Sequence, residues 1–269
     1  MVSAGERDGT DALRPLRPAR HTLLRPYEGT ECAGRFPSRR PDFVPTRAPD
    51  DDCNMIHCKN LHMEYRSGRV SKPVLKGVDF TINPRDRIGL LGRNGAGKST
   101  LIRLIGGVGM PTTGKVVRKM SCSWPLGFTG GFQGSLTGYD NARFIARIYD
   151  KSYAEMRDFL EDFTELGTNL QLPVKIYSSG MRARLAFGLS LAIEFDCYLI
   201  DEVIMVGDKN FQDKCKSEFF EKRTDRALLL ASHSVDTVRE YCTRAIVLHE
   251  GRAQVHEDVA EAIRVYEQL

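Results

Sequence analysis

Apolar and polar residues alternate along the part of the chain that follows Met55. Val78, Phe80 and Ile82 occupy every second position, as residues on one face of a strand do. This alternation predicts strands over 56–65 and 74–82.

A helical spacing replaces the alternation further along the chain. Between about 134 and 175, Phe144, Ile145, Ile148 and Tyr149 share one face of a helix, and a second group repeats that spacing. The second group consists of Met156, Phe159, Leu160 and Phe163. This stretch predicts a helical lobe inserted into the rest of the fold, reaching to about 192.

Short apolar runs and helical patterns take turns in the remainder. The expected elements are a strand over 87–91, helices over 98–106 and from Gly180 to about Ile193, a strand over 197–200, a helix over 209–222, a strand over 227–232, a helix over 234–241, a strand over 244–249 and a closing helix over 259–268. Such alternation is typical of an α/β fold with a mostly parallel sheet wrapped by helices.

The first 54 residues differ from the rest, with seven of the twelve prolines, nine arginines and no lysine. No apolar period runs through them, so disorder is expected. They are either a basic, proline-rich tail with a membrane or partner role, or an upstream extension of a protein that starts at Met55. The second interpretation is favoured because Met55 directly opens the first expected strand.

Composition limits the classes of protein to consider. The chain of 269 residues is 41% hydrophobic and 28% charged, and its net charge of +4 does not single out a nucleic-acid binder. No apolar run approaches 18 residues and the N-terminus lacks a signal-peptide core, so a cytoplasmic location is expected unless a partner holds the chain at a membrane. None of the seven cysteines forms a C-x-x-C pair, which favours reduced thiols over a metal site.

A glycine-rich loop between the strand at 87–91 and the next helix carries the strongest chemical signal. It matches the pattern G-x-x-x-x-G-K-[ST], whose backbone N–H groups bind nucleotide phosphates at a helix N-terminus. Lys98 is expected to supply positive charge to the phosphates, and the Ser99 hydroxyl to coordinate Mg²⁺. The loop consists of Gly92, Arg93, Asn94, Gly95, Ala96, Gly97, Lys98, Ser99 and Thr100.

Two carboxylates follow the apolar strand at 197–200. Asp201 is expected to hold Mg²⁺, directly or through water, at the end of a strand that should lie beside the strand of the loop. Glu202 is expected to act as general base, or to orient and polarise the attacking water.

A serine-glycine turn opens the helix that precedes these carboxylates. The Ser178 hydroxyl and the free N–H groups beyond Gly180 suit a γ-phosphate. Since Lys98 already serves the phosphates from its own side, Ser178 is expected to serve the nucleotide of a second copy. Taken alone, the segment is more typical of an ordinary turn.

Four further residues are candidates because of their places relative to these motifs. His233 ends a strand and is expected to contact the γ-phosphate, while Gln133, before the helical lobe, is expected to touch Mg²⁺ and the water. Tyr65 is either a base-stacking residue or a core or edge aromatic. Asp208 is expected to reach across a dimer interface, to cap a helix, or both.

Together these motifs resemble the ATP-binding subunit of ABC transporters over about residues 55–269. Gly92–Thr100 is similar to the Walker A loop, Gln133 to the Q-loop and Ser178–Met181 to the signature, in which Tyr177, Ser179 and Met181 depart from the usual Leu-Ser-Gly-Gly-Gln. Asp201 and Glu202 resemble Walker B and the catalytic glutamate, Asp208 the D-loop and His233 the switch histidine. The resemblance implies a P-loop NTPase (RecA-like) core with an antiparallel β subdomain and an inserted helical subdomain.

Two segments narrow the resemblance to exporters of polysaccharides and teichoic-acid-like polymers. They are Gly131-Phe132-Gln133-Gly134-Ser135-Leu136-Thr137-Gly138 and Val203-Ile204-Met205-Val206-Gly207-Asp208, and they are most similar to the capsular polysaccharide export ATPases. The resemblance implies ATP and Mg²⁺ as ligands and a homodimer of ATP-binding subunits. It also implies peripheral attachment, through an integral membrane permease subunit, to the cytoplasmic face of the inner membrane.

Two other functions compete with transport. Non-transport ABC ATPases of translation usually carry two such domains, and DNA-associated members carry a long coiled coil. Here one domain is present, and 79 residues without sustained heptads separate Lys98 from Ser178. A GTPase or small-molecule kinase would share only the phosphate loop, and the Asn-Lys-x-Asp motif that reads guanine is missing from the sequence. No nucleic-acid partner is therefore expected.

Overall fold

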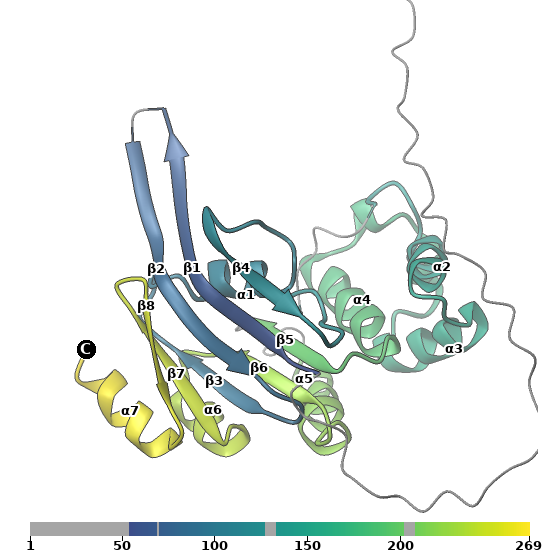
Figure 1. Ribbon diagram of the computed structural model, residues 1–269. Helices are drawn as coiled ribbons and strands as arrows, with labels where there is room; N and C mark the ends of the chain where they lie inside the picture. Colours follow the sequence, from purple (N-terminus) through teal and green to yellow (C-terminus); the bar gives the residue numbers. More distant parts are fainter. Residues whose placement is uncertain (1–53, 69, 127–132, 202–207) are drawn as a thin grey trace, which may run out of the picture. The chain divides into compact units, whose positions relative to one another are not determined.

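Two sheets and a set of helices make up the described part of the chain (Figure 1). The computed structural model describes residues 54–68, 70–126, 133–201 and 208–269. The expected extension over 1–54 therefore lies outside the described residues, apart from Asn54.

One sheet is antiparallel, with the strand order β2-β1-β4. β1 (Ile56–Ser67) and β2 (Val70–Ile82) confirm the two strands that alternation predicted, and both are longer than expected. β4 (Thr113–Arg118) was not expected, because Thr, Gly and Lys fill its first half and its partner β1 lies far away in sequence. The local sequence pattern therefore did not predict β4, because this strand is defined by its pairing with β1.

The second sheet has the order β5-β6-β3-β7-β8, with four parallel strands and an antiparallel edge strand. Its strands are β3 (Arg87–Leu91), β5 (Cys197–Asp201), β6 (Ala227–Ala231), β7 (Arg244–His249) and β8 (Arg252–His256). Four of them confirm the sequence prediction. β8 was missed because it is a mostly polar edge strand with little apolar alternation.

The position of β5 corrects one expectation. β5 does not lie beside β3, because β6 pairs with β5 through Ile200 and Leu230 and with β3 through Gly89 and Leu230. The other edge of β3 pairs with β7, so both edges of β3 are occupied. Asp201 therefore stands two strands away from the loop that follows β3.

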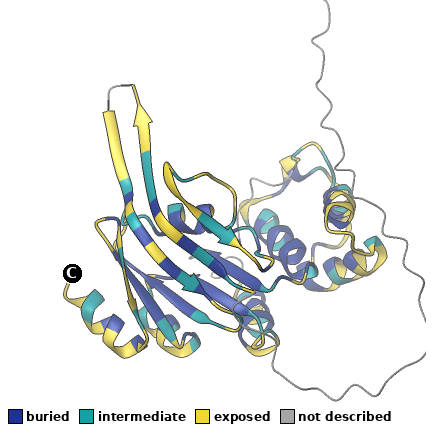
Figure 2. Cartoon of the chain, in the orientation of Figure 1, coloured by how far each residue is buried: buried dark blue, intermediate teal, exposed yellow. Residues whose placement is uncertain are grey.

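Both faces of the parallel sheet are covered, as the continuous buried runs in Figure 2 show. Cys197 and Leu199 point into a core shared with the antiparallel sheet, whereas Tyr198 and Ile200 point into a core shared with helices. Burial on both sides explains why these strands are almost wholly apolar.

Helix α1 (Lys98–Ile105) lies in the core between the two sheets. Its residues Leu101, Ile102 and Ile105 are fully buried among side chains of β1, β2 and β5. The helix that follows the glycine loop is therefore anchored from both sides, which holds the loop at its N-terminus in place.

Helices α2 (Gly138–Ile148), α3 (Tyr153–Thr164) and α4 (Ser179–Ala192) group together (Figure 1). Thr137, Ser152 and Ser178 cap their N-termini through their side chains. The expected helical stretch over 134–175 is confirmed but broken. The breaks include Asp150, whose φ is 50°, and two 3₁₀ turns, η3 (Gly167–Gln171) and η4 (Val174–Ile176).

The remaining helices lie against the parallel sheet. They are α5 (Lys209–Lys216), which continues into a π-helical turn, η6 (Ser217–Glu221), then α6 (Val235–Tyr241) and α7 (Val259–Glu267). Among the described residues, no helix is both long and apolar enough to cross a membrane.

Close packing of α3 on α4 depends on Gly188. A Cβ atom there would lie 2.7 Å from Leu160 Cδ2 and 2.7 Å from Thr164 Cγ2. We predict that Gly188→Ala lowers the free energy of unfolding by about 2 kcal/mol, measured by urea denaturation, because overpacking outweighs the gain in helix propensity. Adding Leu160→Ala should remove part of this penalty. A stabilised Gly188→Ala variant would contradict the packing.

Candidate functional site

The candidate site lies at the carboxyl ends of β3, β6 and β5. Parallel pairing aligns Leu90 with Ala231 and Ala231 with Asp201. The segments after these three strands therefore leave the sheet side by side, at the carboxyl ends of the strands. Ligands of open α/β sheets bind at this edge.

The glycine loop connects β3 to α1 and depends on two glycines for its shape. Gly97 caps α1 with a φ of 110°, and a Cβ atom there would lie 3.1 Å from both Val74 Cγ1 and Leu75 Cδ2. At Gly92, a Cβ atom would lie 2.5 Å from the backbone oxygen of Leu248. Side chains at these positions would displace the loop, which explains the spacing of its glycines.

Lys98 is buried beneath the loop, with 7% of its surface exposed. Its Nζ donates hydrogen bonds to the backbone oxygens of Gly92 at 2.5 Å and Arg93 at 3.5 Å. The ammonium charge is thus held on the inner side of a loop whose N–H groups suit phosphate oxygens.

Ser99 and Asp201 meet although β6 separates their strands. Ser99 Oγ donates a hydrogen bond to Asp201 Oδ1 over 3.2 Å. A hydroxyl and a carboxylate oxygen beside a phosphate loop fit Mg²⁺, which takes few protein oxygens and completes its shell with phosphate and water. Among the described residues no cluster of three His, Cys, Asp or Glu side chains could hold a metal, and a site of this kind does not require one.

Tyr65 stands at the outer end of the loop. Its side chain is 48% exposed, and its hydroxyl lies 3.4 Å from Thr100 Oγ1. A hollow extends from this ring to the loop, lined by Tyr65, Lys72, Val74, Arg93, Asn94, Gly95, Gly97, Lys98, Ser99 and Thr100. The exposed ring lies outside the core, and its position on β1 fits both base stacking and an edge aromatic. Lys72, its cross-strand partner, was missed because an exposed lysine carries no sequence signal.

His233 follows β6 at the same edge of the sheet. It is exposed and lines an open hollow together with Arg93, Asn94 and Tyr266. Tyr266 comes from the closing helix α7, in which the sequence predicted no site residue. The structure therefore brings His233 next to the loop, as its position at the end of a strand suggested.

Gln133 is exposed, and its backbone is tied to α2. The Gln133 N–H donates to Asn141 Oδ1 over 3.0 Å, while Asn141 Nδ2 donates to the backbone oxygen of Gln133 over 3.3 Å. Asn141 is 2% exposed and also donates to the backbone oxygen of Thr137. The loop before the helical lobe is thus joined to the lobe by a buried amide that the sequence did not reveal.

Ser178 caps α4, accepting the Met181 N–H at 3.2 Å and leaving its own O–H to donate. The unusual Tyr177 before it is buried and donates its hydroxyl to the backbone oxygen of Asn169 over 2.6 Å. Burial raises the pKa of Tyr177. The exposed end of α4, with Ser178 and Gly180, can donate hydrogen bonds to an anion.

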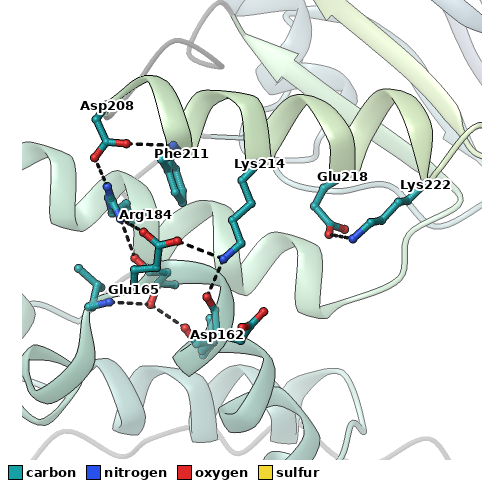
Figure 3. A network of polar contacts seen from close by, with 11 residues as sticks. Asp162, Glu165, Arg184, Asp208, Phe211, Lys214, Glu218 and Lys222 are labelled. Carbon is teal, nitrogen blue, oxygen red and sulfur yellow. Dashed lines mark hydrogen bonds and ion pairs between the residues drawn. The ribbon is translucent and has the colours of Figure 1, made fainter.

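Asp208 caps α5, as one of its two expected roles requires. Its Oδ1 accepts the Phe211 N–H at 3.0 Å, and its Oδ2 pairs with Arg184 (Figure 3). The Phe211 N–H and the Arg184 charge together lower the pKa of Asp208. Glu202, expected to act on the attacking water, lies outside the described residues.

Comparison with known proteins identifies the family. A family model described as ABC transporter matches residues 75–205. The capsule polysaccharide export ATP-binding protein CtrD of Neisseria meningitidis serogroup B is 55% identical over 215 residues, covering 80% of this chain and 100% of the relative. The ATP-binding protein BexA of Haemophilus influenzae is 54% identical over 212 residues, covering 79% and 98%.

Solved structures share the fold. An ATP-binding subunit of an ABC transporter superposes with a TM-score of 0.67 at 24% identity, covering 80% of this chain and 94% of that one. A dimeric ATP-binding cassette, bound to ADP and phosphate after hydrolysis, gives 0.65 at 19% identity, covering 76% and 98%. The α/β fold with a parallel core, an antiparallel sheet and helices is thereby confirmed. Given relatives this similar over nearly their whole length, the chain belongs to the ABC transporter family of ATP-binding proteins.

Proposed function

We propose that the protein is the ATP-binding and ATP-hydrolysing subunit of an ABC exporter that moves capsular polysaccharide through a separate membrane subunit. The observation that carries the ATPase is the Ser99–Asp201 contact beside the buried Lys98. The polymer is inferred from relatives whose names state capsule polysaccharide or polysialic acid, at 55% and 46% identity. These relatives favour transport over a role in translation or DNA metabolism.

ATP binding begins at the glycine loop. Its N–H groups and the Lys98 ammonium would hold the β- and γ-phosphates, and the Tyr65 ring would stack on adenine. Ser99 and Asp201 would hold Mg²⁺, with Gln133 as a further ligand. The metal, when bound, neutralises charge on the phosphates.

Hydrolysis would use the residues that follow β5 and β6. Glu202 would accept a proton from the attacking water or orient it, and His233 would hydrogen-bond the γ-phosphate. His233 lies beside Arg93 and Asn94 of the loop, at the edge where the γ-phosphate would emerge.

A second copy would complete each site. Ser178 and Gly180 open α4 at an exposed helix N-terminus and would donate to the nucleotide held by the partner. Asp208 would lie near the same interface. Two copies would therefore close head to tail on two ATP molecules and reopen after hydrolysis.

The helical lobe offers a surface for the membrane subunit. Phe144 and Ile148 lie one turn apart on α2 and are 54% and 57% exposed, while Ile176 beside the lobe is 60% exposed. Contiguous exposed apolar surface is typical of interaction sites, and the neighbouring Phe144 and Ile148 are proposed to form the centre of such a surface. The protein would thus be held peripherally at the cytoplasmic face of the inner membrane.

The proposed organisation is an ATP-binding domain over 55–269, a helical subdomain over about 134–192 and an extension over 1–54. Under this organisation the extension takes no part in hydrolysis. We predict that deletion of residues 1–54 leaves the kcat for ATP and the melting temperature unchanged. Loss of folding after the deletion would show that the extension belongs to the domain.

Lys98→Ala should lower kcat/KM for MgATP at least about a hundredfold, because the phosphates lose a buried positive charge. The measurement is phosphate release together with binding of a fluorescent ATP analogue. Lys151→Ala, at an exposed lysine in the turn between α2 and α3, is the matched control and should behave as wild type. Normal turnover in Lys98→Ala would remove Lys98 from the site.

Glu202→Gln should bind ATP but hydrolyse it at least about a hundredfold more slowly, because the amide cannot accept a proton from water. With hydrolysis blocked, the closed dimer should accumulate, measured by light scattering after gel filtration with and without MgATP. Hydrolysis at the wild-type rate would show that another group activates the water.

A further inference from the structure

Arg184 lies in the middle of α4, away from the residues that line the nucleotide hollow. Its side chain is only 15% exposed, although it carries a full charge. Three elements meet at its guanidinium: α4 itself, the end of α3 and the start of α5 (Figure 3). The contacts of Arg184 therefore join the helical lobe to the start of α5.

Both terminal nitrogens of the guanidinium donate hydrogen bonds. Nη2 donates to Asp208 Oδ2 over 2.5 Å, and Nη1 donates to Glu165 Oε2 over 3.1 Å and to the backbone oxygen of Thr164 over 3.2 Å. The Cζ atom of the guanidinium also lies over the ring of Phe211, 4.7 Å from the ring centroid. Such a fork fits Arg and not Lys, whose point charge can neither stack nor bridge in this way.

A second cation completes the cluster from α5. Lys214 Nζ lies 3.3 Å from Glu165 Oε1 and donates to the backbone oxygen of Asp162 over 2.7 Å. Glu165 is thus held between two cations, at the end of α3 where its φ of 54° is unusual for a residue with a side chain. The lobe is therefore fastened to α5 at two points.

Asp208 has both carboxylate oxygens engaged within its own chain. One accepts the N–H of Phe211 as a helix cap and the other accepts Arg184. The direction in which Asp208 points is therefore set by Arg184, and the cap alone would leave one oxygen without this restraint.

Stability alone is a poor reason to place this cluster here. An apolar side chain at position 184 would extend the buried ring cluster of Phe163, Phe187 and Phe211 at no cost in desolvation. The guanidinium of Arg184 instead makes directional hydrogen bonds, which hold α4 in one orientation relative to α5.

We infer that Arg184 is a positioning residue for ATP hydrolysis, which locks the helix that starts at Ser178 to the Asp208 cap that follows Asp201 in the chain. Ser178 stands six residues, about 9 Å, along α4 from Arg184. The contact therefore holds the Asp208 cap of α5 in one arrangement relative to α4, the helix that carries Ser178 at its start. This inference rests on the proposed function, in which Asp201 serves the chain's own nucleotide and Ser178 the partner's.

The test compares four single variants of the full-length protein: Arg184→Met, Arg184→Lys, Asp208→Asn and Arg157→Met. Asn still caps a helix but loses the charge, so Asp208→Asn keeps α5 intact. Arg157→Met is the control, because Arg157 pairs only with Asp158 and Glu161 of its own helix among the contacts described. The measurements are kcat and KM for MgATP, and Tm.

Arg184→Met should lower kcat about tenfold with KM for ATP changed less than about twofold, since the nucleotide hollow stays intact. Arg184→Lys should recover part of kcat, and Arg157→Met should match wild type. The double variant Arg184→Met, Asp208→Asn should have a kcat no lower than that of the worse single variant. Both substitutions remove the same contact, so their effects should not add.

Other outcomes overturn the inference. A lowered Tm with unchanged kcat in Arg184→Met would make the contact purely structural, and fully additive losses in the double variant would separate Arg184 from Asp208. A wild-type protein without MgATP hydrolysis, or one insensitive to Lys98→Ala, would overturn the proposed function itself and this inference with it. The two failures are therefore distinguishable.

Discussion

The parallel register of β3, β6 and β5 is the constraint on which the site depends. It places the ends of three strands at one edge, so that the glycine loop, His233 and Asp201 leave the sheet together. Ser99 can then reach Asp201 across the intervening strand. The register is stable because both faces of the sheet are buried, where a slip of one residue would exchange the two cores.

The helical lobe is attached to this sheet by two kinds of contact. Apolar packing forms a core that contains Leu160 and Phe187 of the lobe and Tyr198 and Ile200 of β5. Directional polar contacts, through Asn141 at the Gln133 loop and Arg184 at Asp208, lie at its margins. Apolar packing is non-directional, whereas hydrogen bonds are directional, so these polar contacts fix the orientation of the lobe on the sheet.

Local patterns predicted the parts of the fold that local interactions make. The glycine loop and most elements of the parallel sheet follow from residue type and spacing, and they lie where the sequence placed them. β4 and β8 were missed because each is an edge strand defined by its partner. The order of β5 and β3 was wrong for the same reason, since strand order is a property of long-range pairing.

The site was predictable to the same extent. Lys98, Ser99 and Asp201 carry motif signals, whereas Lys72, Asn141, Arg184 and Tyr266 have ordinary residue types in unremarkable sequence positions. Their importance arises only when distant segments meet, as Arg184 and Asp208 do. The pattern of residues along the chain does not predict such long-range contacts.

The central claim is that the chain powers transport through a membrane subunit, and purification from native membranes tests it most directly. Tagged protein would be isolated in mild detergent, its co-purifying chains identified and its MgATP hydrolysis measured. The account predicts a multispanning membrane protein in stable complex with this chain, and ATP hydrolysis by that complex. Recovery with ribosomes or DNA, or recovery without any membrane protein, would contradict it.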